Sequence, residues 1–189
     1  MTKIQVTPHS EGIDKLRELV LYVCKASETD EAFGSIKLNK LLFFSDFLSY
    51  IEHGVSITGQ EYQKLKNGPA PRVMLPLLND MQTAQQLAVA KRSYFGRVQK
   101  RPLALREATL ARFSGQEIAL VDYVMRTLKG HNGMEISELS HQFTGWELAE
   151  EGETIPYSSA LLQSTPLTSQ ERQWAQELDM TGVEELLCA

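Results

Sequence analysis

The segment from Ile36 to Ile51 constrains the fold more than any other part of this sequence. Apolar side chains there cover most of the circumference of a helix, which is typical of a helix enclosed by other elements. We predict that this helix begins after Ser35, ends at Gly54 and forms the hub of the core, since glycine commonly follows the last residue of a helix. The apolar positions are Ile36, Leu38, Leu41, Leu42, Phe43, Phe44, Phe47, Leu48 and Ile51.

Shorter apolar stripes predict further helices on either side of this hub. The first runs from after Ser10 to about Lys25, and its apolar residues recur at steps of three and four. Ser114 and Glu117 form a capping-box pattern ahead of another stripe that ends before Gly130. The remaining predictions are a helix over Arg72–Asp80 with Pro71 as its first residue, one around Glu135–Gln142, a capped turn at Thr144–Glu147, a short helix from Pro156 and a terminal helix from Thr168.

The stretch Leu87–Leu105 has a different pattern, with apolar residues spaced among basic ones and a turn-like Tyr94–Arg97. This predicts a β-hairpin, and a looser alternation over Val55–Lys66 predicts an extended piece. We therefore expect a mainly α (α+β) fold. It would be a single compact helical domain around a buried central helix, with a small β-hairpin or sheet element.

Composition excludes several classes of protein. With 42% apolar and 23% charged residues, the chain of 189 residues has enough apolar material for a core, and disorder throughout is not expected. The longest apolar run, Leu41–Phe44, is too short to span a bilayer, and the first residues lack the pattern of a signal peptide. We expect a cytoplasmic protein with no membrane contact, in which Cys24 is a buried apolar residue and no disulfide joins it to Cys188.

Residues that carry catalytic or metal chemistry are not arranged in a recognisable pattern. The four histidines are not spaced as metal ligands, and no glycine-rich phosphate loop occurs. Ser140 and His141 are neighbours on a predicted helix, so their side chains point about 100° apart and cannot act as nucleophile and base. We expect no enzymatic activity, no cofactor and no metal.

Charge is unevenly distributed along a chain whose net charge is −5. The hairpin region 91–112 is basic and the end of the chain, from Thr144, is acidic. The basic residues could be the solvent-facing side of a hairpin, or contact the acidic region or a protein partner. They could also contact nucleic acid, with Tyr94 and Phe95 stacking on bases; in an acidic chain this is the less favoured interpretation. The residues concerned are Lys91, Arg92, Arg97, Lys100 and Arg101.

Two motifs together resemble the Panacea (SocA-like) antitoxin domain. The first is Ile36-Lys37-Leu38-Asn39-Lys40-Leu41-Leu42-Phe43-Phe44-Ser45-Asp46, followed by Gly54 and then by Tyr62-x-x-Leu65-Lys66-Asn67-Gly68-Pro69-Ala70-Pro71. The second is Ser137-Glu138-Leu139-Ser140-His141-x4-Trp146, followed by Ile155-Pro156-Tyr157. Phe43-Phe44 stands where the family often has a tyrosine. The resemblance is strongest over residues 14–162, and we expect a single domain over 10–189 with a C-terminal helical extension at 163–189.

The resemblance implies an antitoxin of a toxin–antitoxin system that neutralises a cognate toxin by direct protein–protein binding. It also leaves two alternatives: a proteolytic adaptor that delivers a toxin to an AAA+ protease, and a DNA-binding autoregulator that uses the basic hairpin 91–112. A homo-oligomer is a further alternative. The motif residues that the resemblance marks as framework or partner-binding are Lys37, Lys40, Tyr62, Lys66, Gly68, Pro69, Ser140, His141 and Trp146.

The chemistry of these motif residues suggests specific roles. Lys37 and Lys40 lie on an apolar helix, so they either pair with a carboxylate and fix the Gly68-Pro69 turn or line a charged groove for a toxin segment. His141 and Trp146 are either a hydrogen-bonded pair in the core or part of a binding surface.

Overall fold

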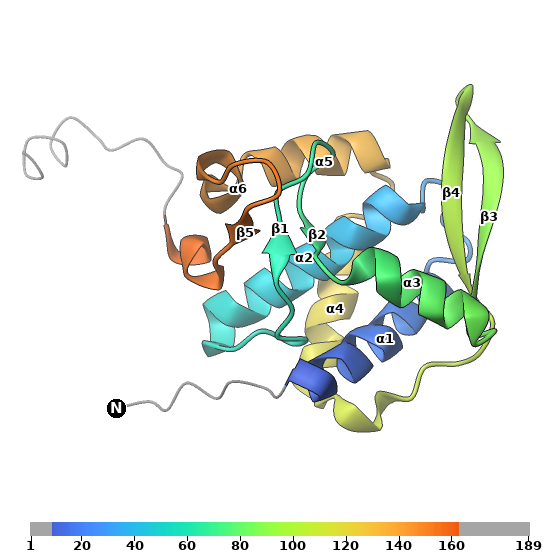
Figure 1. The fold of residues 1–189 in the computed structure, drawn as a ribbon, viewed down its shortest axis with the longest axis horizontal. Coiled ribbons are helices and arrows are strands. Elements are labelled where there is room, and N and C mark those ends of the chain that lie inside the picture. Colours follow the sequence, from blue (N-terminus) through green and yellow to red (C-terminus); the bar gives the residue numbers. More distant parts are fainter. Residues whose placement is uncertain (1–8, 163–189) are drawn as a thin grey trace, which may run out of the picture.

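The computed structural model describes residues 9–162, in which helices surround a central helix and a β-hairpin stands at one edge (Figure 1). The helices are α1 (His9–Ala26), α2 (Ser35–His53), α3 (Met74–Thr83), α4 (Gly115–Thr127), α5 (Gly133–His141) and α6 (Thr144–Leu148), with short 3₁₀ turns at Leu110–Arg112 and Tyr157–Leu161. The strands are β1 (Tyr62–Gln63), β2 (Ala70–Pro71), β3 (Leu87–Tyr94), β4 (Arg97–Ala104) and β5 (Thr154–Ile155). This mainly helical α+β architecture confirms the predicted fold class.

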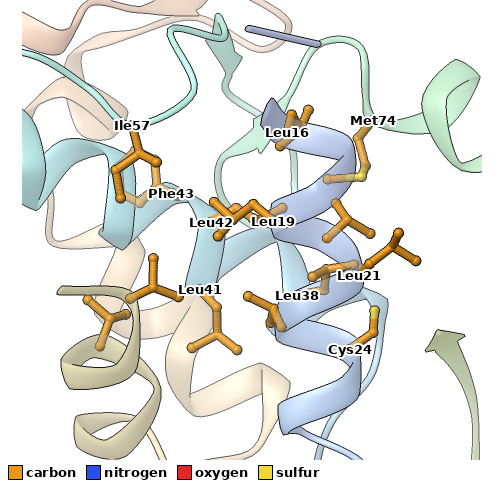
Figure 2. Packing of buried hydrophobic residues seen from close by; sticks show 14 of the residues in the cluster. Leu16, Leu19, Leu21, Cys24, Leu38, Leu41, Leu42, Phe43, Ile57 and Met74 are labelled. Carbon is orange, nitrogen blue, oxygen red and sulfur yellow. The ribbon is translucent and has the colours of Figure 1, made fainter. Parts of the chain in front are cut away.

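Helix α2 is the hub, as its sequence predicts. It packs against α1, α4 and α5, and Leu38, Leu41 and Leu42 on it are fully buried. In Figure 2 these leucines belong to the same buried cluster as Leu16 and Leu19 of α1. Each buried leucine contributes about 2 kcal/mol by removing its apolar surface from water, so the leucines of α2 stabilise the core substantially. The helix ends where predicted, with Gly54 as its C-cap.

Strands β3 and β4 form the predicted hairpin. They pair antiparallel from Leu87↔Ala104 to Tyr94↔Arg97, which leaves a two-residue turn at Phe95 and Gly96. Both turn residues have positive φ, 47° for Phe95 and 74° for Gly96, as a tight turn that follows the twist of the strands requires. The base of the hairpin is buried at Leu87, whereas Phe95 is 89% exposed at the tip. In Figure 1 the hairpin projects beside the N-terminal end of α2 and beside α5.

A second, three-stranded sheet has the order β2-β1-β5 and joins distant parts of the chain. Tyr62 pairs with Pro71 on one side and with Ile155 on the other. These two-residue strands are too short to leave an alternating pattern, so the sequence predicted only an extended piece over Val55–Lys66. The sheet brings the two sequence motifs together.

Some helix ends differ from the predictions. The prediction that Pro71 opens a helix is wrong, because Pro71 pairs with Tyr62 in the edge strand β2, where its missing N–H costs nothing, and α3 begins at Met74. Thr144 does not cap α6. The cap is Phe143, whose ring packs 5.2 Å from the rings of Phe43 and Phe47 and so fixes the backbone one residue earlier. The capping box at Ser114 is confirmed, and a second at Asn132 was not predicted.

Cys24 is buried, as predicted. Cys188 and the predicted terminal helix from Thr168 lie outside the described residues.

Candidate functional site

Lys40 fixes the Gly68-Pro69 turn from inside the fold. Its side chain is 1% exposed, and Nζ donates a hydrogen bond of 2.8 Å to the carbonyl of Pro69. Gly68 has φ of 85°, and a Cβ added there would lie 2.6 Å from Cε of Lys40, so a side chain larger than hydrogen would displace the lysine. Within residues 9–162 no carboxylate lies within 4 Å of Nζ, and burial lowers the pKa of Lys40 to about 7. The predicted link between this lysine and the turn is present, but a carbonyl takes the place of the expected carboxylate.

Lys37, one turn earlier on α2, is also buried but has the expected acidic partner. Its Nζ lies 2.8 Å from Oδ2 of Asp30 and donates a 2.7 Å hydrogen bond to the carbonyl of His131. These contacts hold the loop before α2 and the loop before α5 against the same turn of the helix. Lys37 therefore ties three segments together.

Asp46, one and a half turns after Lys40, is a buried polar centre that sequence reasoning did not select. Its carboxylate accepts hydrogen bonds from the Thr58 N–H (2.7 Å), the Thr58 hydroxyl (2.5 Å) and the Tyr62 hydroxyl (2.7 Å). Burial raises the pKa of Asp46 above its ordinary value, although these hydrogen bonds oppose the shift. The signal in the sequence is an acid within the most apolar part of the helix, between Phe44 and Phe47.

His141 and Trp146 stack on one another. Their ring centroids are 3.9 Å apart with planes at 15°, and Nζ of Lys64 lies 4.2 Å above the Trp146 ring. Within the described residues, the buried Nε2 of His141 and Nε1 of Trp146 have no hydrogen-bond partner, so the hydrogen-bonded version of this pair is wrong. Burial lowers the pKa of His141; the Glu138 carboxylate opposes this shift, and Lys40 and Lys64 add to it.

The remaining motif residues divide between the interior and the surface. Ser140 is fully buried and donates to the Ser137 carbonyl at 2.7 Å, whereas Lys66 is exposed and its backbone N–H donates to a Glu151 oxygen at 3.1 Å. Lys37, Lys40, Tyr62, Gly68 and Pro69 are buried like Ser140. This arrangement favours a framework role for the buried residues.

The basic residues of the hairpin also divide into two groups. Arg101 is 6% exposed and donates to the carbonyls of Ser27, Glu28, Asp30 and Phe33, which closes the end of α1. Arg92 donates to the Glu31 carbonyl at 2.8 Å. The other three, Lys91, Arg97 and Lys100, are exposed. The hairpin is thus anchored at its base and free at its tip.

A groove of about 810 Å³ lies between the free part of the hairpin and the helical body. One wall consists of the turn and the exposed part of β4, including Phe95, Arg97, Val98 and Lys100. The other wall consists of the first turn of α2, one face of α5 from Gly133 to its last residue, and the end of the first motif, including Ile36, Lys37, Lys66, Met134 and His141. Three of the nine residues marked as framework or partner-binding (Lys37, Lys66 and His141) therefore meet the basic hairpin in one concave site.

The described residues contain neither a cluster of metal ligands nor a membrane-spanning helix. Between His9 and Leu162, no group of three or more His, Cys, Asp or Glu side chains is placed to hold a metal ion. In the same part of the chain, none of the helices has both the length and the apolarity to cross a membrane.

The fold and the site define a mainly helical α+β domain in which a buried lysine, Lys40, fixes a Gly-Pro turn beside a basic groove. The family model described as "Antitoxin SocA-like, Panacea domain" matches residues 38–147, which is more than half of the chain. This chain belongs to that family, as the resemblance of its two motifs indicated. No curated protein and no solved structure matches it.

Proposed function

We propose that this chain acts in the cytoplasm as an antitoxin that neutralises a cognate toxin by binding it directly, without chemistry. The observation that carries the proposal is the groove: a member of an antitoxin family presents a concave site with exposed apolar and basic side chains. Clustered exposed apolar side chains are typical of interaction sites, and aromatic and arginine residues such as Phe95 and Arg97 are common anchors in protein interfaces.

The placement of the titratable motif residues supports binding over catalysis. Burial lowers the pKa of Lys40 and raises the pKa values of Asp46 and Tyr62, and displaced pKa values are a mark of many active sites. All three are buried, however, and their polar atoms are engaged with the Pro69 carbonyl or with each other. A substrate would have to unfold part of the core to reach them.

Two of the basic hairpin residues are engaged in hydrogen bonds within the protein, which weakens the DNA-binding alternative. Arg92 and Arg101 donate their side-chain N–H groups to backbone carbonyls of residues 27–33, so neither is available for phosphate contacts without loss of these hydrogen bonds. A ribbon that binds DNA depends on several phosphate contacts.

Co-expression with the protein encoded beside this chain's gene tests the proposal. We expect that the neighbouring protein alone arrests growth, and that this chain restores growth and co-purifies with it. Rescue with loss of the neighbouring protein and no stable complex would instead establish a proteolytic adaptor. A neighbouring protein that does not affect growth would contradict the antitoxin assignment.

A further inference from the structure

We propose that the groove between the hairpin and the helical body binds an acidic segment of the toxin that carries an exposed apolar side chain. This inference rests on the proposed function, and it names the partner chemistry of the same site. It concerns the surface residues of the groove, whereas the family motif consists largely of buried ones.

Most of the charged side chains that line the groove are basic. Lys66, Arg97 and Lys100 are exposed there, and Glu138 is the acid that lies among them. The ammonium of Lys37 is already paired with Asp30. The groove is therefore locally positive on a chain whose net charge is −5, and this local sign selects an acidic partner and speeds its approach.

The α2 helix adds to this preference for negative charge. Its first turn lines the groove, the N-cap residue Gly34 has no side chain to cap the helix, and no acidic residue occurs in the first turn. A helix of 19 residues carries partial positive charge at its N-terminus. A carboxylate in the groove would meet this end of α2 as well as the basic side chains.

Exposed apolar side chains distinguish the groove from a purely electrostatic site. Phe95 is 89% exposed, Val98 74% and Met134 55%, and all three line the groove. Burying one such side chain against a partner contributes about 2 kcal/mol, which is more than an exposed ion pair contributes. An acidic segment with an apolar side chain would satisfy both kinds of surface.

The hairpin wall is held in place before any partner arrives. Arg101 anchors β4 through four carbonyls, and the Ser35 hydroxyl donates to the Lys100 carbonyl at 3.1 Å. At Gly34 an added Cβ would lie 3.1 Å from the same carbonyl, so strand and helix are in close contact there. A preformed groove loses little conformational entropy on binding.

Two matched pairs of variants test the groove, with the protein encoded beside the gene as the probe. Arg97→Glu is compared with Arg126→Glu, an exposed arginine in the last turn of α4, and Phe95→Ala with the exposed Leu75→Ala on α3. We expect each groove variant to raise the Kd for the probe at least tenfold, while each control stays within twofold. Thermal unfolding of all four variants verifies that they are folded.

The outcomes separate this inference from the proposed function. If the wild-type chain does not bind the probe, the proposed function fails. If it binds and the groove variants match their controls, the function stands and the groove assignment is overturned.

A photo-crosslinking residue in place of Val98 identifies the occupant. We expect it to label a toxin peptide rich in Asp and Glu. Labelling of residues 163–189 of this chain would assign the groove to its own acidic end and overturn the proposal. DNA is the other possible occupant. If the wild-type chain binds a DNA duplex of about 30 base pairs tightly and Arg97→Glu abolishes this binding, the groove is a nucleic-acid site and the proposal is overturned.

Discussion

At the scale of single residues, the interior of this protein contains three buried cationic side chains whose polar partners differ. Lys37 has a carboxylate, Arg101 has four carbonyls and Lys40 has one carbonyl. A buried cation is costly unless its donors are satisfied, so Lys40 is the least stable of the three in its charged form. The pKa of about 7 reflects this environment.

Replacement of Lys40 by methionine should remove a pH dependence of stability. The pKa of Lys40 falls from the ordinary 10.5 to about 7 on folding, so between these values the unfolded chain binds more protons. The free energy of unfolding of the wild type should therefore rise with pH across this window, with a slope of up to about 1.4 kcal/mol per pH unit. In Lys40→Met this contribution is absent.

Urea unfolding at about pH 7 and about pH 9 measures the difference. Lys66→Met, which changes an exposed lysine close to the same turn, is the control and should keep the wild-type slope. Equal slopes in Lys40→Met and the wild type would contradict a buried lysine with a lowered pKa.

Arg101→Met should lower the free energy of unfolding by about 3 kcal/mol, because four carbonyls of the loop between α1 and α2 lose their donor together. The neighbouring Lys100→Met changes an exposed side chain and should stay within about 0.5 kcal/mol of the wild type. Chemical denaturation of both variants gives the comparison. If Arg101→Met and Lys100→Met lower the free energy of unfolding by similar amounts, Arg101 does not anchor the hairpin.

At the scale of elements, the hairpin joins a structural base to an exposed tip, for which we propose a role in toxin binding. Its base is buried, whereas the tip places Phe95 in a left-handed conformation at φ 47°. A bulky aromatic residue there is strained, and asparagine followed by glycine suits such a turn better. Strain of this kind is common at sites where function selects the residue.

Phe95→Asn should therefore stabilise the protein by about 1 kcal/mol and weaken toxin binding. Phe95→Ala removes the same ring but does not favour positive φ, so it should weaken binding without stabilising the fold. Thermal unfolding and a binding titration of both variants test this. If Phe95→Asn leaves toxin affinity unchanged, the ring is not an anchor.

The sequence predicted elements with strong local signals and missed those that depend on distant contacts. The apolar circumference of α2, the Ser114 capping box and the turn at Tyr94–Arg97 were all read correctly from neighbouring residues. The strands β2 and β5 were not predicted, since two-residue strands exist only through their pairing with β1. The Asp46 centre was missed for the same reason, because its donors lie 12 and 16 residues away along the chain.

At the scale of the whole molecule, an acidic chain carries a local positive groove. Association with an acidic toxin segment should therefore slow as salt rises, because salt screens the attraction between exposed charges. Stopped-flow association rates at low and physiological ionic strength measure this effect. The double variant Arg97→Glu/Lys100→Glu should lose most of the salt dependence of the association rate. If its salt dependence equals that of the wild type, the attraction comes from charges outside the groove.

The central claim is that neutralisation is stoichiometric binding and involves no chemistry. The most direct test adds increasing amounts of this chain to a fixed amount of the purified toxin and follows residual toxin activity and toxin mass over time. The account predicts that inhibition ends at a fixed molar ratio, does not grow with longer incubation and leaves the toxin mass unchanged. Progressive inactivation by substoichiometric amounts, or a change in toxin mass, would contradict it.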